Sequence, residues 1–259
     1  NHRAFIFGKR KIQILNLITT SFKEVYLHLS HYHAFPLINQ PERNNLFCCA
    51  DNDISDFPYF KNKFPWYNNL PFYVVPFVVD DRFEVCNQDK EFKCCITGTY
   101  HDIPRNKIDF GIYNSNGNST LHPLRFELSK YDHDLINKRL SLFGFKDPLA
   151  KQKDYFKFNI VNFYNQYKYA LVPGEGNGLI AIGSLEALNC GCKIFLTPWE
   201  AKGLFDDTEY VSYDGSLKDF INKLEFLINL NQSEPSRTIS KFKKNELILR
   251  FKNTFSYND

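Results

Sequence analysis

The feature that most constrains the fold is a regular alternation of strand and helix signals from residue 91 onwards. Strands separated by crossover helices pair in parallel, because each helix returns the chain to the same end of the sheet. The sequence therefore predicts a parallel α/β domain. Its expected strands are Phe92–Thr97, Tyr169–Pro173, Lys193–Thr197 and Tyr210–Tyr213, with Gly98-Thr99 as the turn that leaves the first. Its expected helices begin at Ser119-Thr120, Tyr155, Ser184 and Ser216.

The part before residue 91 carries weaker signals of the same kind. Apolar residues recur at steps of three and four from Ile12 to Leu29, which predicts a helix. Leu46–Ala50 is a short apolar strand candidate, and Phe72–Asp80 is rich in the β-branched and aromatic residues typical of a buried strand. A boundary near residues 75 to 90 then divides the chain into a small N-terminal α/β domain, 1–85, and a larger domain, 86–259.

Composition excludes several classes of protein. The formal net charge of +3 is far from the strongly basic balance of proteins that bind nucleic acid non-specifically, so no nucleic-acid partner is expected. No apolar run approaches the roughly 20 residues of a membrane span. The odd count of 7 cysteines is no disulfide scaffold and favours a reducing, intracellular compartment, with the thiols buried as structural residues.

A glycine-bearing loop, Gly174 to Gly178, follows one expected strand and leads into a helix. Such a loop presents free backbone amides and the positive end of a helix at one point, and this arrangement binds phosphate. A tight strand-to-helix turn with no ligand is an equally good reading of the glycines alone. The residues nominated for the loop site from this pattern are Gly174, Gly176 and Asn177.

The wider pattern favours the ligand-binding reading. Tyr169–Asn177, followed by Ser184–Thr197 with its Glu-Ala-Leu and Cys-Gly-Cys runs, resembles the donor-binding half of GT-B glycosyltransferases. The similarity is greatest to the family 4, CgeB-like and exostosin-like groups. Phe77–Asp80 with Arg82-Phe83 resembles the hinge before that domain, and the likeness extends to Tyr257. It implies a Rossmann-like C-terminal donor domain and a small or truncated acceptor-side domain.

The resemblance also implies roles for individual residues, and it adds Glu175 and Ser184 to the expected donor-binding residues. Glu186 would hold the ribose hydroxyls of a nucleotide sugar, and a carboxylate suits this because it accepts two hydrogen bonds at once. Gly98 would form the first strand-to-helix turn. The basic residues expected to neutralise the diphosphate are Arg105, Lys107 and Arg125. Histidines of the N-terminal domain, His31 and His33 with neighbouring His28, are candidates for the general base, and Asp51, Asp53 and Asp56 are further acidic candidates.

The implied activity is transfer of a sugar from a UDP- or GDP-sugar to a saccharide, a lipid-linked acceptor or a protein, as in polysaccharide biosynthesis, with no essential metal or cofactor. A cytoplasmic location is expected, and the basic runs at Lys9–Lys11 and Lys241–Lys244 are compatible with weak attachment to the inner membrane face. Two alternatives stay open. One is a catalytically inactive GT-B-like nucleotide-binding or partner protein, and the other is an NAD-dependent oxidoreductase, although the glycine spacing is not that of the Rossmann fingerprint.

Overall fold

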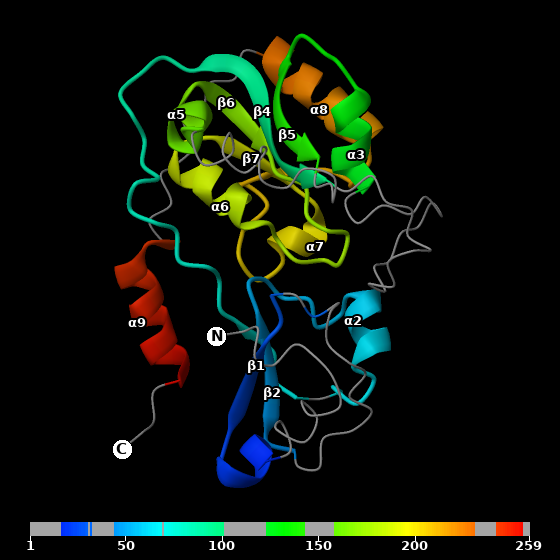
Figure 1. The fold of residues 1–259 in the computed structure, drawn as a ribbon, viewed down its shortest axis with the longest axis vertical. Helices are drawn as coiled ribbons and strands as arrows, with labels where there is room; N and C mark the ends of the chain where they lie inside the picture. The colour runs from blue at the N-terminus through cyan, green and yellow to red at the C-terminus, as the bar shows by residue number, and fades with distance from the viewer. Residues whose placement is uncertain are drawn as a thin grey trace.

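Two parallel sheets organise the chain in the computed structural model (Figure 1). The structure describes residues 17–30, 32, 44–68, 70–100, 123–142, 158–230 and 242–255. Every strand pair within these ranges is parallel. The predicted class, α/β with a large Rossmann-like C-terminal unit and a small N-terminal one, is therefore confirmed.

The N-terminal unit has a three-stranded sheet in the order β1-β2-β3, with helix α2 beside it. The bounds are β1 Val25–His28, β2 Leu46–Ala50, β3 Tyr73–Val74 and α2 Pro58–Lys63. Aromatic side chains dominate the core, where Phe60, Phe64 and Tyr32 are fully buried. Large rings fill space efficiently, which suits a unit with few residues to bury.

The C-terminal unit is a five-stranded sheet in the order β5-β4-β6-β7-β8. The strands are β4 Glu91–Tyr100, β5 Ile136–Leu142, β6 Tyr167–Leu171, β7 Lys193–Leu196 and β8 Val211–Ser212. The helices are α3 Pro123–Lys130, α5 Ile160–Asn165, α6 Ile182–Asn189, α7 Pro198–Ala201 and α8 Leu217–Asn229, followed by α9 Lys244–Phe255. Helices α5 and α6 cover one face, and α3 and α8 cover the other (Figure 1).

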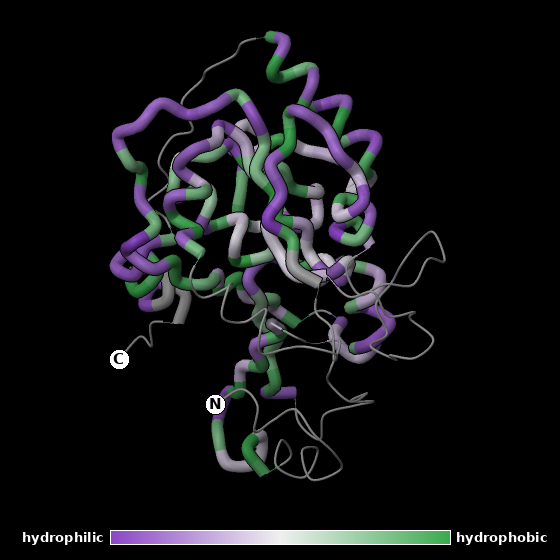
Figure 2. Tube along the Cα trace, turned by 45° about the horizontal axis from the view of Figure 1, so that its top comes forward, coloured by the Kyte–Doolittle hydropathy of each residue, from purple (hydrophilic) through white to green (hydrophobic). Residues whose placement is uncertain are grey.

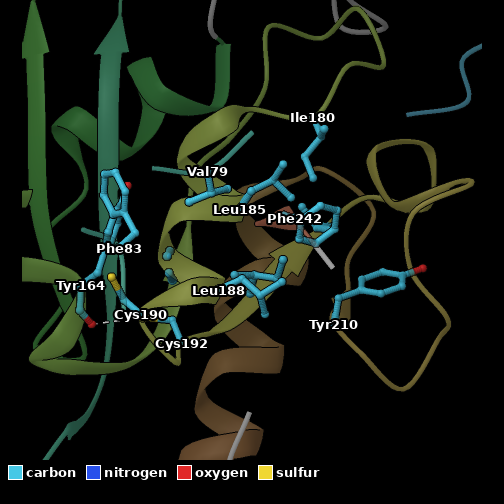
Figure 3. Close-up of a cluster of buried hydrophobic side chains, with 14 of the residues drawn as sticks. Val79, Phe83, Tyr164, Ile180, Leu185, Leu188, Cys190, Cys192, Tyr210 and Phe242 are labelled. Atoms are coloured by element: carbon cyan, nitrogen blue, oxygen red, sulfur yellow. Dashed lines mark hydrogen bonds between the residues drawn. The ribbon is translucent and has the colours of Figure 1, made fainter. Parts of the chain in front are cut away.

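The helices bury one side each. On α8, Phe220, Ile221 and Leu224 are buried against the sheet, and Figure 2 shows the resulting alternation of hydrophilic and hydrophobic residues along this helix. The segment between β3 and β4, residues 75–90, links the two units. On the other face of the sheet, its residues Val79 and Phe83 lie in one cluster with Leu185 and Leu188 of α6 (Figure 3). The linker is thus part of the C-terminal core and does not hang free.

The chain fixes the linker a second time from its C-terminal end. Phe242, which precedes α9, is fully buried in the same cluster, and its carbonyl accepts a hydrogen bond from the Val79 amide at 3.1 Å (Figure 3). Lys243 donates to the Phe83 carbonyl at 2.9 Å. The segment before α9 therefore holds the linker against the larger unit.

The two sheets meet through the loops that follow their strands. The loop after β2 contacts the loops after β6 and β7: the Asp53 amide donates to the Lys202 carbonyl at 2.8 Å, and the Phe57 ring packs on Trp199 with centroids 5.3 Å apart. Because all strands are parallel, the carboxyl ends of both sheets face this contact (Figure 1). Ligands of open parallel sheets bind at such ends.

Several predicted elements agree closely with the structure. β2 has the predicted bounds, β7 ends one residue early, and α8 lies between its Ser216 N-cap and its Leu230 C-cap. The expected Pro in the first turn of α3 is Pro123. The predicted start of that helix at Ser119-Thr120 lies outside the described residues, as does Tyr155. Six cysteines are buried as expected, whereas Cys86 is exposed.

Other predictions were wrong. Residues 17–21 are helical, but Val25–His28 is strand β1, since pairing with Leu46–Cys49 overrides a helical spacing that Val25 and Leu29 share by coincidence. Gly98 and Thr99 form no turn and continue β4, which pairs with β5 up to Tyr100. The edge strand β5 was not predicted, because its polar residues give no buried pattern. Of the expected strand Phe72–Asp80 only β3 pairs, and Pro76, which has no amide proton, follows it closely.

Candidate functional site

The site is built around Arg125, which α3 places at the carboxyl ends of β4 and β6. Its Nε donates to the Pro173 carbonyl at 2.7 Å and its Nη1 donates to the Thr99 carbonyl at 2.9 Å. The guanidinium lies on the backbone of Gly98, where a Cβ would be 2.8 Å from Arg125 Cζ. Gly98 also has a φ of 141°, so glycine is required here for both reasons. The structure thus brings together two of the predicted residues, Gly98 and Arg125.

A buried carboxylate, Glu200, ties two further loops to this edge. Glu200 Oε2 accepts from the amide and the hydroxyl of Thr197, both at 2.9 Å, in the capping box that begins α7. Glu200 Oε1 accepts from the Gly174 amide at 3.1 Å. Burial raises the pKa of Glu200, while the hydrogen bonds from Thr197 and Gly174 and the charge of Arg125 oppose the rise. Arg125 and Glu200 therefore form one buried polar cluster.

The glycine loop of residues 174 to 178 is held close to this cluster. A Cβ on Gly174 would lie 2.7 Å from Glu200 Oε1 and from the Leu179 carbonyl. Gly176 and Gly178 have φ values of 71° and 82°. Asn177 is buried, accepts from the Leu179 amide at 3.1 Å and donates to Glu175 at 3.3 Å. The loop therefore has a fixed shape that needs glycine at its bends.

Helix α6 begins just beyond this loop. Its N-cap, Ala181, provides no side-chain hydrogen bond to the first-turn amides. Ser184 is buried, and its hydroxyl donates to the Val172 carbonyl at 3.4 Å, so its contact is with the strand-end backbone. First-turn amides without a side-chain cap give the N-terminus of a helix a positive potential that favours anions.

Glu186 lies one turn further along α6 and is half-buried. Burial raises its pKa; the Arg82 charge opposes this rise and the Asp80 charge adds to it. Within the described part of the chain no hydrogen-bond or ion-pair partner reaches its carboxylate. A half-buried carboxylate without a protein donor can accept hydrogen bonds from water or from a ligand.

The N-terminal side of the contact carries a second buried acid. Asp51 follows β2 directly and is 1% exposed. Burial raises its pKa to about 8, and the amides of Asp51 and Phe77 oppose the rise. Among the described residues its Oδ1 has no hydrogen-bond partner, and the nearest cationic candidate is His28, whose Nε2 is 3.8 Å away. The same nitrogen lies 3.3 Å from the Val75 carbonyl.

The remaining predicted residues are not all placed. Arg105, Lys107, His31 and His33 lie outside the described residues, so their roles stay predictions. Asp53 and Asp56 both pair with Lys202, at 3.4 and 2.8 Å. No three His, Cys, Asp or Glu side chains gather as a metal site in the ranges that the structure describes. None of the helices described there is long and apolar enough to cross a membrane.

Two residues central to this edge were missed by the sequence reasoning. Glu200 had a readable signal, because Thr197-Pro198-Trp199-Glu200 is a capping-box pattern with proline in the first turn. Asn52 had none. Its side chain contacts residues more than 120 positions away, and no local pattern reports such a contact.

Comparison with known proteins adds little to this geometry. No protein-family model and no curated protein matches the chain. Among solved structures, the crystal structure of TarM is similar with a TM-score of 0.46 and 10% sequence identity, over 95% of this chain and 58% of that one. The chain thus spans less than two thirds of the length of TarM. A likeness of this size carries no argument about activity, which is argued below from the residues alone.

Proposed function

We propose that the protein is a nucleotide-sugar-dependent glycosyltransferase whose donor binds at the carboxyl ends of β4, β6 and β7. The observation that carries the proposal is Glu186, a half-buried carboxylate without a hydrogen-bond partner in the described residues, one turn into the helix after the glycine loop. A ribose offers two adjacent hydroxyls, and both can donate to one carboxylate. The ribose hydroxyls of the nucleotide sugar would therefore replace water on the Glu186 carboxylate.

The diphosphate of the donor would lie against the glycine loop and the N-terminus of α6. Arg125 contributes a fixed positive charge at this edge, held by Pro173 and Thr99. The first-turn amides of α6 contribute hydrogen-bond donors. These groups would stabilise the negative charge that develops on the leaving diphosphate, and they need no reorganisation during the reaction. On this proposal no essential metal ion is required.

The acceptor hydroxyl would approach from the N-terminal unit and attack the anomeric carbon, whose bond to the diphosphate oxygen breaks. Orienting the two substrates between the facing sheets supplies part of the rate enhancement. The acceptor is proposed to be a saccharide, lipid-linked or protein hydroxyl, with His31 or His33 as the candidate base.

The first test is a thermal-shift screen of UDP, GDP, CMP, ADP and NAD against three proteins. These are the unmodified chain, Glu186→Gln and the control Glu127→Gln, which changes an exposed glutamate on α3. A ligand present at a hundred times its Kd stabilises the native state by about 2.7 kcal/mol. We expect UDP or GDP to raise the Tm of the unmodified chain and the control, and to raise that of Glu186→Gln much less.

The second test measures the reaction. With the diphosphate found in the screen, the corresponding nucleotide sugars are incubated with the protein and simple saccharide acceptors, and release of the diphosphate is followed. Release that depends on the protein and falls in Glu186→Gln supports the proposal. Stabilisation by NAD alone supports the oxidoreductase, and binding of a diphosphate without any release supports an inactive nucleotide-binding protein.

A further inference from the structure

Asn52 is a fully buried amide of the N-terminal unit whose hydrogen bonds all reach the C-terminal unit. Its Nδ2 donates to the carbonyls of Gly178 and Trp199, both at 2.8 Å. Its Oδ1 accepts from the Ile180 amide at 2.9 Å. One side chain of the N-terminal unit thus bridges the loop after β6 and helix α7.

Other contacts from the N-terminal unit hold Asn177 and Gly178, the last two residues of the glycine loop. The Tyr32 hydroxyl donates to the Asn177 carbonyl. A Cβ on Gly178 would lie 2.8 Å from the Phe57 ring, so the loop is pressed directly against the N-terminal unit. By contrast, the first residue of the loop, Gly174, is held by Glu200 within its own unit. The loop is therefore anchored at one end by each unit.

The position of these anchors connects them to the start of α6. Residues 177 to 180 lead into Ala181, the N-cap, whose side chain does not fix the first turn. Asn52 is the side chain that pairs with both the Gly178 carbonyl and the Ile180 amide. If the two units moved apart, those backbone groups would exchange Asn52 for water, and the directed hydrogen bonds that fix the end of the loop would be lost.

We propose that Asn52 is a positioning residue that couples the contact between the two units to the shape of the glycine loop. The loop keeps the described shape while Asn52 is engaged, and it loosens when the units separate. Where the loop binds a nucleoside diphosphate, which rests on the proposed function, binding and contact between the units strengthen each other by the same factor. Asn52 thereby acts on ligand affinity through the loop.

The test compares Asn52→Ala with the control Asn189→Ala. Asn189 is also a buried amide, but within the described residues neither atom of its side-chain amide has a hydrogen-bond partner. Amide hydrogen exchange of the full-length chain is followed by mass spectrometry, and the Kd for UDP and for GDP is measured by calorimetry. In Asn52→Ala we expect exchange in residues 177 to 182 to rise about tenfold, with unchanged exchange in β4 and β6, and Kd to rise about tenfold.

The two readouts separate this inference from the proposed function. Faster loop exchange in Asn52→Ala, but not in Asn189→Ala, supports the coupling even if neither nucleotide binds the unmodified chain. Loop exchange equal to that of the unmodified chain overturns it, and so does an unchanged Kd for a nucleotide that does bind. Should Asn52→Ala fail to fold, Tyr32→Phe removes only the hydroxyl on Asn177 and must raise exchange in the same segment; if it does not, the coupling is refuted.

Discussion

Replacing Asp51 by Asn is expected to stabilise the protein at neutral pH and to have little effect in acid. Asp51 is buried, and burial raises its pKa from 3.8 to about 8. The native state therefore keeps a proton that the unfolded chain releases near pH 4, so unfolding releases a proton between about pH 4 and pH 8. Stability from this group is fully present below pH 4 and is lost as the pH rises towards 8.

The size of the effect follows from the pKa shift of Asp51. Within this window each pH unit lowers the free energy of unfolding by about 1.36 kcal/mol, so it falls by about 4 kcal/mol between pH 4 and pH 7. That is a large share of the roughly 5–15 kcal/mol that stabilises a typical domain. Asn is close to Asp in size, keeps an acceptor oxygen for the Phe77 amide, and does not ionise. The Asp51→Asn variant should therefore lack this pH dependence.

Urea denaturation at half-unit steps from pH 4.5 to 7.5 measures the difference between the variant and the unmodified chain, provided that both unfold reversibly in two states. The difference cancels the titration of groups that the two proteins share. We expect it to grow by about 1.4 kcal/mol per pH unit. A difference that stays within about 1 kcal/mol over the whole range would refute the reasoning and would assign any remaining pH dependence to other groups.

Three further outcomes are expected. Arg125→Gln removes the buried guanidinium bonds to the Pro173 and Thr99 carbonyls, so urea unfolding should show a loss of about 1–3 kcal/mol. Gly178→Ala should cost about 2 kcal/mol more than Gly215→Ala in the same assay, because both glycines have positive φ but only at Gly178 would the new methyl strike a ring. Of the seven thiols, only Cys86 should react with a maleimide in the native state, and all seven should react in denaturant.

The elements that the sequence predicted well are those whose signals are local. β2 is a short apolar run between polar residues, and α8 carries a capping serine and an apolar stripe. The failures came where a distant partner decides the structure. Val25–His28 has side chains at helical spacing, yet it becomes a strand because β2 lies beside it. The edge strand β5 pairs along its whole length with β4, although its sequence is mostly polar.

The candidate site divides in the same way. The glycine loop was predicted from its local pattern and Glu186 from the resemblance to GT-B glycosyltransferases, and Gly98 and Arg125 were nominated and do meet. The roles assigned to them for a ligand remain predictions. Asn52 could not be predicted from the sequence, because its three hydrogen-bond partners are more than 120 positions away and belong to the other unit. Long-range polar contacts of this kind depend on the assembled fold and leave no periodic trace.

The buried pair of Arg125 and Glu200 shows what this edge of the sheet is built to do. Burying two charges is expensive, and a well-packed hydrophobic pair is often as stable. A hydrophobic pair, however, could not hold backbone groups. Arg125 fixes the carbonyls of Pro173 and Thr99, and Glu200 fixes the amides of Thr197 and Gly174. The end of β4 and the segments after β6 and β7 are each held by this pair of side chains. We infer that the charges are retained for this geometry, because they keep polar backbone groups pointing in set directions. On the proposed function, this fixed arrangement would provide the electrostatic stabilisation of the donor diphosphate.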